Sequence, residues 1–285
     1  MVMKSELIEM SDGAYIYAER YENKGKPLVL LIPGFCCTTR SFDQNVQAIS
    51  ETYEVVTYDP RGQGKSSKGL FGHTVERNAK DILEIIEHFG HDDVSIVSWS
   101  MAGQFVMDYV RQFGTKHISS ITLADCPLHA LGDEEWNAHG LRENNMDHFT
   151  EHCMQSYNGW NDYCLGFAKK IWGGIDDSRI EDAAHEFMKT PPWIAFAIYS
   201  DMVFRNGHKY LSEVDVPMLF AGADSRVTTN GKELASKWYP KEREGKYKSE
   251  VCTFDNGGHV FFDVEASKFN EAVLNFWANI YGVRK

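Results

Sequence analysis

The sequence lacks the long apolar runs that would place it in or across a membrane. No stretch approaches the roughly 18 consecutive apolar residues of a membrane helix. The first ten residues include Lys4, Glu6 and Glu9 and have no apolar run of the signal-peptide kind. We therefore expect a cytoplasmic protein with no membrane partner.

Positive charge is also scarce. The chain has 29 Lys and Arg against 41 Asp and Glu, a formal net charge of -12 at pH 7. A nucleic-acid-binding surface attracts phosphates with a basic face, and this balance repels them. We expect no nucleic-acid partner.

Cysteine is infrequent and is not arranged in metal-binding or redox motifs. The six cysteines show no C-x-x-C spacing and no N-x-S/T glycosylation site accompanies them, so buried free thiols are expected. His148 and His152 fit an H-x-x-E-H zinc pattern, but no second motif supplies a third ligand, and a solvated helix face explains them. Neither G-x-G-x-x-G after the first long strand nor a Walker loop is present, so we expect no metal and no cofactor.

What the sequence does contain is the alternation typical of an α/β fold. Apolar residues make up 43% of the 285 residues, enough for one substantial core. The continuous apolar run Leu28–Ile32 predicts a strand buried on both faces, and Asp12-Gly13 before it suits a tight hairpin turn. Similar runs recur at 55–58, 94–97, 118–124, 218–221 and 251–254, with helical patterns between most of them. The pattern predicts a mostly parallel central sheet flanked by helices.

The alternation stops between residues 127 and 210. This stretch has no clear strand and carries Trp136, Trp160, Trp172 and Trp193 among polar residues. We interpret it as a helical cap over the carboxyl ends of the strands. The predicted division is a core of residues 1–126 and 211–285 with a cap of residues 127–210.

One serine lies at a predicted strand-to-helix turn. Ser98-Trp99-Ser100-Met101-Ala102-Gly103 follows a predicted strand and begins a predicted helix, and small residues at 98, 102 and 103 leave room for a sharp turn. Such a turn exposes Ser100 at a helix N-terminus. Taken alone, Ser98 and Ser100 could equally be ordinary caps at the end of a strand.

The motif resembles the nucleophile elbow of the α/β-hydrolase superfamily, with Ser98 and Ala102 in place of its two glycines. Four more segments resemble that superfamily in the expected order over nearly the whole chain. They are 30–35, with Pro33-Gly34 where His-Gly is commoner, the 59–66 loop of D-x-R-G-x-G-x-S type, 218–224, and 256–259. We interpret the 59–66 loop as structural, because Asp59 and Arg61 can satisfy loop amides and carbonyls.

The resemblance implies a catalytic triad of Ser100, Asp224 and His259 in the chain order of that superfamily. Asp224 follows a buried strand through a Gly-x-Asp turn, and His259 stands on a glycine-rich loop after the last strand. Asp125, directly after the strand at 118–124, is the competing acid, since some relatives place theirs there. We favour Asp224 because its turn fits the commoner pattern.

The resemblance also implies an oxyanion hole made by the N–H groups of Phe35 and Met101. The side chains of Phe35, Cys36 and Trp99 lie beside these loops and are predicted to contact substrate.

These residues predict a serine hydrolase that cleaves a small, mostly apolar carboxylic ester or lactone. A serine nucleophile argues against the dehalogenases and epoxide hydrolases of the fold, which need a carboxylate. Cofactor-free perhydrolase, carbon–carbon bond hydrolase, small-molecule receptor and interaction scaffold remain as alternatives. The sequence leaves the oligomeric state, including a homodimer, open.

Overall fold

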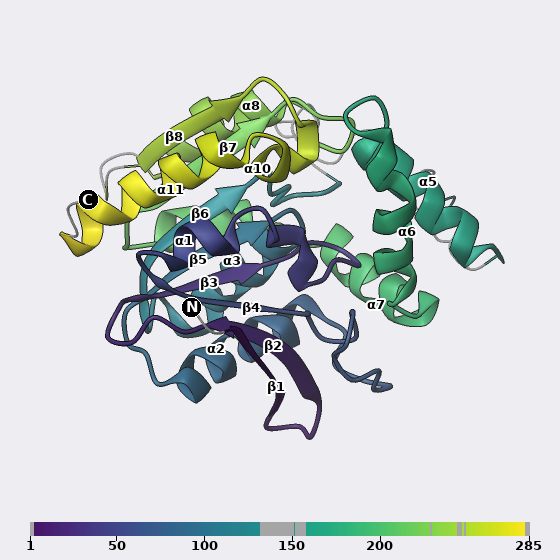
Figure 1. Cartoon of the computed structure of the whole chain (residues 1–285), viewed down its shortest axis with the longest axis horizontal. Coiled ribbons are helices and arrows are strands. Elements are labelled where there is room, and N and C mark those ends of the chain that lie inside the picture. The colour runs from purple at the N-terminus through teal and green to yellow at the C-terminus, as the bar shows by residue number, and fades with distance from the viewer. Residues whose placement is uncertain are drawn as a thin grey trace.

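The computed structural model describes residues 3–131, 151, 158–228, 230–243, 247 and 249–282. Within them a single sheet runs through the molecule with helices around it (Figure 1). The predicted N-terminal hairpin is present, and a helix ends the described chain.

The sheet has eight strands in the order β1-β2-β4-β3-β5-β6-β7-β8. β1 pairs antiparallel with β2, and β2 pairs antiparallel with β4, whereas all later pairs are parallel. The strands are β1 (Met3–Glu9), β2 (Tyr15–Tyr21), β3 (Leu28–Ile32), β4 (Glu54–Tyr58), β5 (Val94–Trp99), β6 (Ile118–Ala124), β7 (Met218–Ala223) and β8 (Ser249–Phe254). The predicted fold class is confirmed.

The central strands are buried on both faces, as their apolar sequences require. Every residue of β3, β4 and β5 is buried, because helices cover both sides of a parallel sheet. The predicted hairpin turn also forms: Gly13 has φ +80°, and the Met10 N–H donates to the Ala14 carbonyl.

Helices connect the strands and shield the sheet. Thr74 caps α2 by accepting a hydrogen bond from the Arg77 N–H, and threonine is one of the residues favoured at this position. α2 packs against α3, and α1 packs against α11. The helices outside the β6–β7 connection are η1 (Thr39–Phe42), α1 (Val46–Ser50), α2 (Val75–Phe89), α3 (Ala102–Phe113), α8 (Gly231–Glu233), the π-helical η4 (Leu234–Trp238), α9 (Tyr239–Lys241), η5 (Gly258–Val260), α10 (Phe261–Val264) and α11 (Ala266–Tyr281).

The connection from β6 to β7 is helical in its described part. It contains α5 (Trp160–Trp172), η2 (Asp177–Arg179), α6 (Ile180–Met188), α7 (Pro192–Val203) and η3 (His208–Glu213). Helices α5, α6 and α7 lie together at one side of the molecule (Figure 1). Within this connection the described residues form helices and turns, apart from one bridge between His129 and Asn206. Trp136 lies outside the described residues. The division into core and cap domains stays a prediction.

Two further expectations can be compared with the described residues. No helix among them has the length and apolar character needed to cross a membrane. No group of three or more His, Cys, Asp or Glu in the described ranges could hold a metal ion. His148 and His152 of the H-x-x-E-H pattern lie outside those ranges.

Candidate active site

Ser100 occupies the sharp turn between β5 and α3. Its φ is +58°, a left-handed conformation that is uncommon for a residue with a side chain and characteristic of strained functional turns. The Ser100 N–H donates to the Ala124 carbonyl of β6, and the Gly103 N–H donates to the Ser100 carbonyl. These bonds hold the sharp turn predicted from 98–103, but Ser100 is buried rather than exposed.

Close packing around the elbow explains its small residues. A Cβ added at Gly103 would lie 2.5 Å from the Cβ of Cys126, because α3 approaches the end of β6 there. A Cβ added at Gly34 would lie 2.9 Å from the Cβ of Ser100. Glycine at position 34 therefore lets the loop after β3 lie directly against the serine.

His259 joins Ser100 to a buried carboxylate. Ser100 Oγ lies 2.9 Å from His259 Nε2, and His259 Nδ1 lies 2.6 Å from Oδ2 of Asp125. With the proton on Nδ1, the ring donates to the carboxylate and accepts from the serine hydroxyl. All three residues are buried, in an environment where charge-assisted hydrogen bonds are strong.

The prediction that Asp224 is the acid partner of His259 is wrong. Asp224 is exposed at the end of β7, where its Oδ1 accepts a long hydrogen bond of 3.4 Å from the Lys232 N–H. Asp125, the alternative acid, ends β6, which is the strand adjacent to β5 and so one strand nearer to Ser100. His259 reaches the nearer carboxylate.

The Gly-x-Asp turn that favoured Asp224 has another cause. A Cβ added at Gly222 would lie 2.4 Å from the Gly231 carbonyl oxygen, and one added at Gly231 would lie 2.2 Å from the Ala223 carbonyl oxygen. The two glycines let α8 approach β7 closely. Gly222 is thus explained by helix packing rather than by an acid at position 224.

Ser225 contacts Asp125, and this contact was not predicted from the sequence. Its hydroxyl lies 3.4 Å from Asp125 Oδ2 and accepts hydrogen bonds from the N–H groups of Val227 and Thr228. The other oxygen of Asp125, Oδ1, has no hydrogen-bond partner among the described residues. No local sequence signal marks Ser225, because its contact depends on β6 and β7 being neighbours.

Trp99 packs against His259 and forms a hydrogen bond with its backbone. Its indole N–H donates to the His259 carbonyl at 2.9 Å, and the two ring centroids are 5.3 Å apart. The indole also packs on Phe262 of α10, with centroids 4.9 Å apart. The predicted contact of Trp99 with substrate stays a prediction, whereas its contact with His259 was not foreseen.

One predicted oxyanion donor follows Ser100 in the chain, and the other lies on the loop after β3 that packs against Ser100. Met101 follows Ser100 directly, and Phe35 follows Gly34, which lies against Ser100. Neither the Phe35 N–H nor the Met101 N–H has an acceptor among the residues that the structure describes. Both N–H groups are therefore available to a ligand oxygen.

The side chain of Phe35 lies within an aromatic cluster contributed by the helical connection. Its ring centroid is 5.9 Å from that of Phe167 on α5 and 5.7 Å from that of Tyr199 on α7. Phe167 in turn contacts Phe187 of α6 at 5.2 Å. The loop after β3 is thus covered by apolar rings close to Ser100.

Cys36 is buried in a positive-φ conformation of +57°. Burial raises the pKa of its thiol well above the ordinary value of 9.0. The thiol therefore stays protonated at neutral pH and is a poor nucleophile. Its predicted contact with substrate stays a prediction. The five cysteines that the structure describes are all free, as expected.

In the 59–66 loop Asp59 bonds backbone amides as predicted, whereas Arg61 bonds carboxylates rather than the loop carbonyls that were expected. Asp59 accepts hydrogen bonds from the N–H groups of Thr39 (2.8 Å) and Lys65 (2.6 Å). Arg61 donates to both oxygens of the buried Asp81. These bonds fix the loop beside η1 and α2.

With this geometry in place, the comparisons with known proteins identify the family. Residues 27–266 match the model of the alpha/beta hydrolase fold, so the chain belongs to this family. Its structure is similar to a bromoperoxidase from Bacillus anthracis, with a TM-score of 0.86, 23% identity and coverage of 96% of this chain and 99% of that one.

Curated relatives cover shorter segments. A bifunctional esterase/perhydrolase of Acinetobacter calcoaceticus is 23% identical over 49% of this chain and 51% of its own length. A karrikin insensitive 2 receptor of Petunia hybrida is 24% identical over 68% of this chain and 72% of its own length. Among the relatives that match first, the chain spans about a third to a half of their length.

Proposed function

We propose that the protein is a serine hydrolase that cleaves a small, mostly apolar carboxylic ester or lactone through an acyl-enzyme. The observation that carries this proposal is the continuous chain of contacts Ser100 Oγ, His259 Nε2, His259 Nδ1 and Asp125 Oδ2. This arrangement is the one that activates a serine hydroxyl in acyl transfer. Asp125 takes the acid's role in place of Asp224.

In the first half-reaction Ser100 Oγ attacks the carbonyl carbon while His259 Nε2 accepts the hydroxyl proton. Asp125 stabilises the resulting imidazolium and keeps its ring in the useful orientation. The N–H groups of Phe35 and Met101 stabilise the oxyanion, and loss of one such donor costs about 10² to 10³ in rate. His259 then protonates the departing alcohol.

In the second half-reaction water attacks the acyl-Ser100 ester. His259 takes a proton from the water and returns one to Ser100 as the tetrahedral intermediate collapses. In a lactone the departing alcohol remains part of the acyl chain, and the same steps release a hydroxy acid. Neither pathway needs a group beyond the three side chains, the two N–H groups and water.

The aromatic cluster around Phe35 supports the proposal that the substrate is mostly apolar. Rings of Phe35, Phe167, Tyr199 and Phe187 lie together beside the elbow and favour apolar over charged acyl groups.

The proposal is tested with p-nitrophenyl esters of increasing acyl length, using the purified protein and Ser100→Ala. We expect hydrolysis that depends on acyl length, loss of at least about 10³-fold in Ser100→Ala, and a phosphonate adduct on Ser100 by mass spectrometry. A folded protein without turnover and without adduct contradicts the proposal.

A receptor of small molecules is the second candidate, favoured by the similarity to the karrikin insensitive 2 receptor over 68% of the chain. The two functions differ in turnover. A receptor binds ester or lactone ligands with little or no multiple turnover, whereas the hydrolase releases product in excess of enzyme. Peroxide added to the same assay separates the perhydrolase alternative, because a peracid then replaces part of the acid product.

A further inference from the structure

The loop after β3 contains a tight turn of residues 34–37. The Cys37 N–H donates to the Gly34 carbonyl at 3.2 Å, which is the hydrogen bond that closes a β-turn. Cys36, the third residue of the turn, has φ +57°, whereas Phe35, the second, is outside the positive-φ region. A positive φ at the third position alone is the pattern of a type II turn, which ordinarily has glycine or asparagine there.

The turn sets the direction of the Phe35 N–H. The Gly34–Phe35 peptide is trans, so the Gly34 carbonyl and the Phe35 N–H point in opposite directions. Because the carbonyl accepts the Cys37 N–H inside the turn, the Phe35 N–H points out of it. A Cβ added at Gly34 would lie 2.9 Å from the Ser100 Cβ and 3.4 Å from Ser100 Oγ. The N–H therefore leaves the turn close to the serine hydroxyl.

Cysteine in this conformation is strained. The left-handed region brings a Cβ close to the carbonyl oxygen, so residues other than glycine adopt it at a cost. Five described residues other than glycine have a positive φ, and three of them, Cys36, Ser100 and Asp125, belong to the candidate site or its loops. Strain of this kind gathers at functional sites and persists where the surroundings hold it. The position of the turn therefore indicates a role beyond reversing the chain.

Contacts on both sides of Cys36 hold the turn in place. The Phe35 ring before it packs on Phe167 and Tyr199 of the helical connection. The Cys37 thiol after it donates to the Phe35 carbonyl at 3.2 Å. The side chain of Cys36 is itself buried. Rotation of the peptide between Phe35 and Cys36 would break the bond to the carbonyl and disturb this packing.

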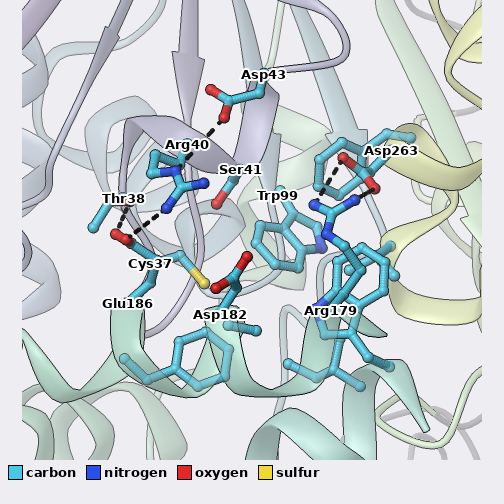
Figure 2. A pocket seen from close by; sticks show the side chains of 16 residues that line it. Cys37, Thr38, Arg40, Ser41, Asp43, Trp99, Arg179, Asp182, Glu186 and Asp263 are labelled. Atoms are coloured by element: carbon cyan, nitrogen blue, oxygen red, sulfur yellow. Dashed lines mark hydrogen bonds and ion pairs between the residues drawn. The ribbon is translucent and has the colours of Figure 1, made fainter. Parts of the chain in front are cut away.

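The residues that follow the turn are tied to the helical connection across a cavity. This cavity lies behind Trp99, has a volume of about 80 Å³ and has Cys37 and Thr38 in its wall, with charged side chains of both parts of the molecule around it (Figure 2). Glu186 of α6 accepts hydrogen bonds from Thr38 at 2.9 Å and from Arg40 at 3.1 Å. The chain is thus anchored immediately after the turn.

We propose that Cys36 is a positioning residue of the oxyanion hole, because its left-handed conformation closes the turn that directs the Phe35 N–H to the carbonyl oxygen of the substrate. This inference rests on the proposed function, in which that N–H stabilises the tetrahedral intermediate. Cys36 acts through its backbone, and its thiol takes no part in the chemistry. Any side chain that tolerates a positive φ can therefore replace it.

Three substitutions at position 36 separate backbone conformation from packing. Cys36→Gly removes the side chain and favours a positive φ, Cys36→Ser keeps a side chain of similar size, and Cys36→Thr adds a methyl group that makes it β-branched and least compatible with a positive φ. We expect kcat for p-nitrophenyl esters to stay within about threefold of the parent in the Gly and Ser variants. In the Thr variant we expect kcat to fall about 10²-fold with little change in KM, because one oxyanion donor is lost.

A packing role predicts the opposite order, since glycine leaves the largest cavity and threonine fills the space best. A loss of kcat of more than about tenfold in folded Cys36→Gly therefore overturns the proposal, and this variant decides the case even if Cys36→Thr does not fold.

Cys164→Thr is the matched control, since it makes the same substitution at a buried cysteine of α5 whose backbone is helical. We expect a similar loss of unfolding temperature and a kcat within about threefold of the parent. Comparable losses of kcat in Cys36→Thr and Cys164→Thr overturn the proposal.

The Phe35 N–H gives a readout that needs no turnover. When Ser100 reacts with a phosphonate, the phosphonyl oxygen takes the position of the oxyanion. In protein with isotope-labelled phenylalanine, we expect the Phe35 amide signal, assigned with Phe35→Leu, to shift on adduct formation in the parent and in Cys36→Gly. The shift should be much smaller in Cys36→Thr, and an equal shift in all three proteins overturns the role of position 36.

These experiments distinguish failure of this inference from failure of the proposed function. A parent protein with neither turnover nor adduct overturns the proposed function and, with it, the role of the turn. A parent protein that hydrolyses esters, with equal kcat in the Gly, Ser and Thr variants, keeps the proposed function and overturns the positioning role of Cys36 alone.

Discussion

At the scale of single residues, two aspartates end neighbouring strands and only one reaches the histidine. Asp125 after β6 is buried and lies 2.6 Å from His259 Nδ1, while Asp224 after β7 is exposed. An acid in this position fixes the tautomer of the ring and stabilises its positive charge during the reaction. The proposed activity therefore depends on one of these carboxylates and not on the other.

We predict that Asp125→Asn lowers kcat/KM for p-nitrophenyl esters by about 10³ to 10⁴-fold, because asparagine cannot stabilise the imidazolium. Asp224→Asn is the matched control, with an expected change of less than about twofold. Steady-state kinetics of both variants check this prediction, and a comparable loss in the two variants contradicts it.

In the proposed mechanism Trp99 is a positioning residue, because its indole N–H bonds the His259 carbonyl and does not touch the reacting atoms. We predict that Trp99→Phe, which keeps an aromatic ring and removes the N–H, lowers kcat about tenfold and changes KM little. The matched control is Trp277→Phe, because the buried indole N–H of Trp277 has no partner among the described residues.

The two tryptophan variants separate positioning from packing. Both substitutions remove buried ring atoms and lower the unfolding temperature. Only Trp99→Phe is expected to lower kcat of the folded enzyme and to alter the pH profile that reports on His259. Equal kcat values for the two variants would show that the hydrogen bond to His259 has no positioning role.

At the scale of elements, the β1–β2 hairpin is fastened to α2 by charged hydrogen bonds. The N–H and hydroxyl of Ser11 both donate to Glu84 at 2.7 Å, and Arg77 donates to the same carboxylate. Although burial would raise it, these hydrogen bonds hold the pKa of Glu84 below its ordinary value of 4.5. The folded protein thus favours the ionised carboxylate.

We predict that the contribution of Glu84 to the free energy of unfolding is about 1 kcal/mol at pH 7 and falls at acid pH. A lowered pKa in the folded state gives stabilisation that is complete above the unfolded pKa and is lost as the pH falls through the folded one.

Urea unfolding of the parent protein and Glu84→Gln at pH 7 and at about pH 3 measures this difference. The difference in free energy of unfolding between the two proteins should be smaller at the lower pH. Glu271→Gln, which removes an exposed charge of α11, serves as the control and should show no such gap. A gap that widens on acidification contradicts the prediction.

At the scale of the whole molecule, the helical connection is joined to the core on both sides of the cavity. Glu186 of α6 accepts hydrogen bonds from Thr38 at 2.9 Å and Arg40 at 3.1 Å. Arg179 of η2 pairs with the buried Asp263 of α10. These contacts join segments more than 80 residues apart in the sequence.

We predict that the double variant Glu186→Gln/Asp263→Asn increases the rate of amide hydrogen exchange in α6 about tenfold, which corresponds to a loss of about 1.4 kcal/mol of local stability. The exchange rate in α11 should not change. Mass spectrometry of exchanged peptides measures both helices at once. The control is Glu181→Gln/Asp162→Asn, which removes two exposed charges from α6 and α5 without touching the core contacts. Similar exchange in the two double variants contradicts the role of these links.

Much of the fold and part of the site follow from sequence alone. The strand β3, the hairpin turn at Gly13 and the cap at Thr74 are set by residues close together in the chain, so local patterns predict them. The strained turn at Ser100 is equally local, since small residues surround it on both sides. The position of His259 after the last strand also follows from the order of elements.

Only the tertiary structure decides which carboxylate meets His259. That choice depends on β6 lying between β5 and β7, and on Gly222 and Gly231 bringing α8 against β7. The hydrogen bond from Trp99 to His259 and the charged cavity behind it likewise join residues far apart in the chain. Local sequence determines the conformation of each turn and strand, whereas contacts between strand ends depend on how the whole sheet is assembled.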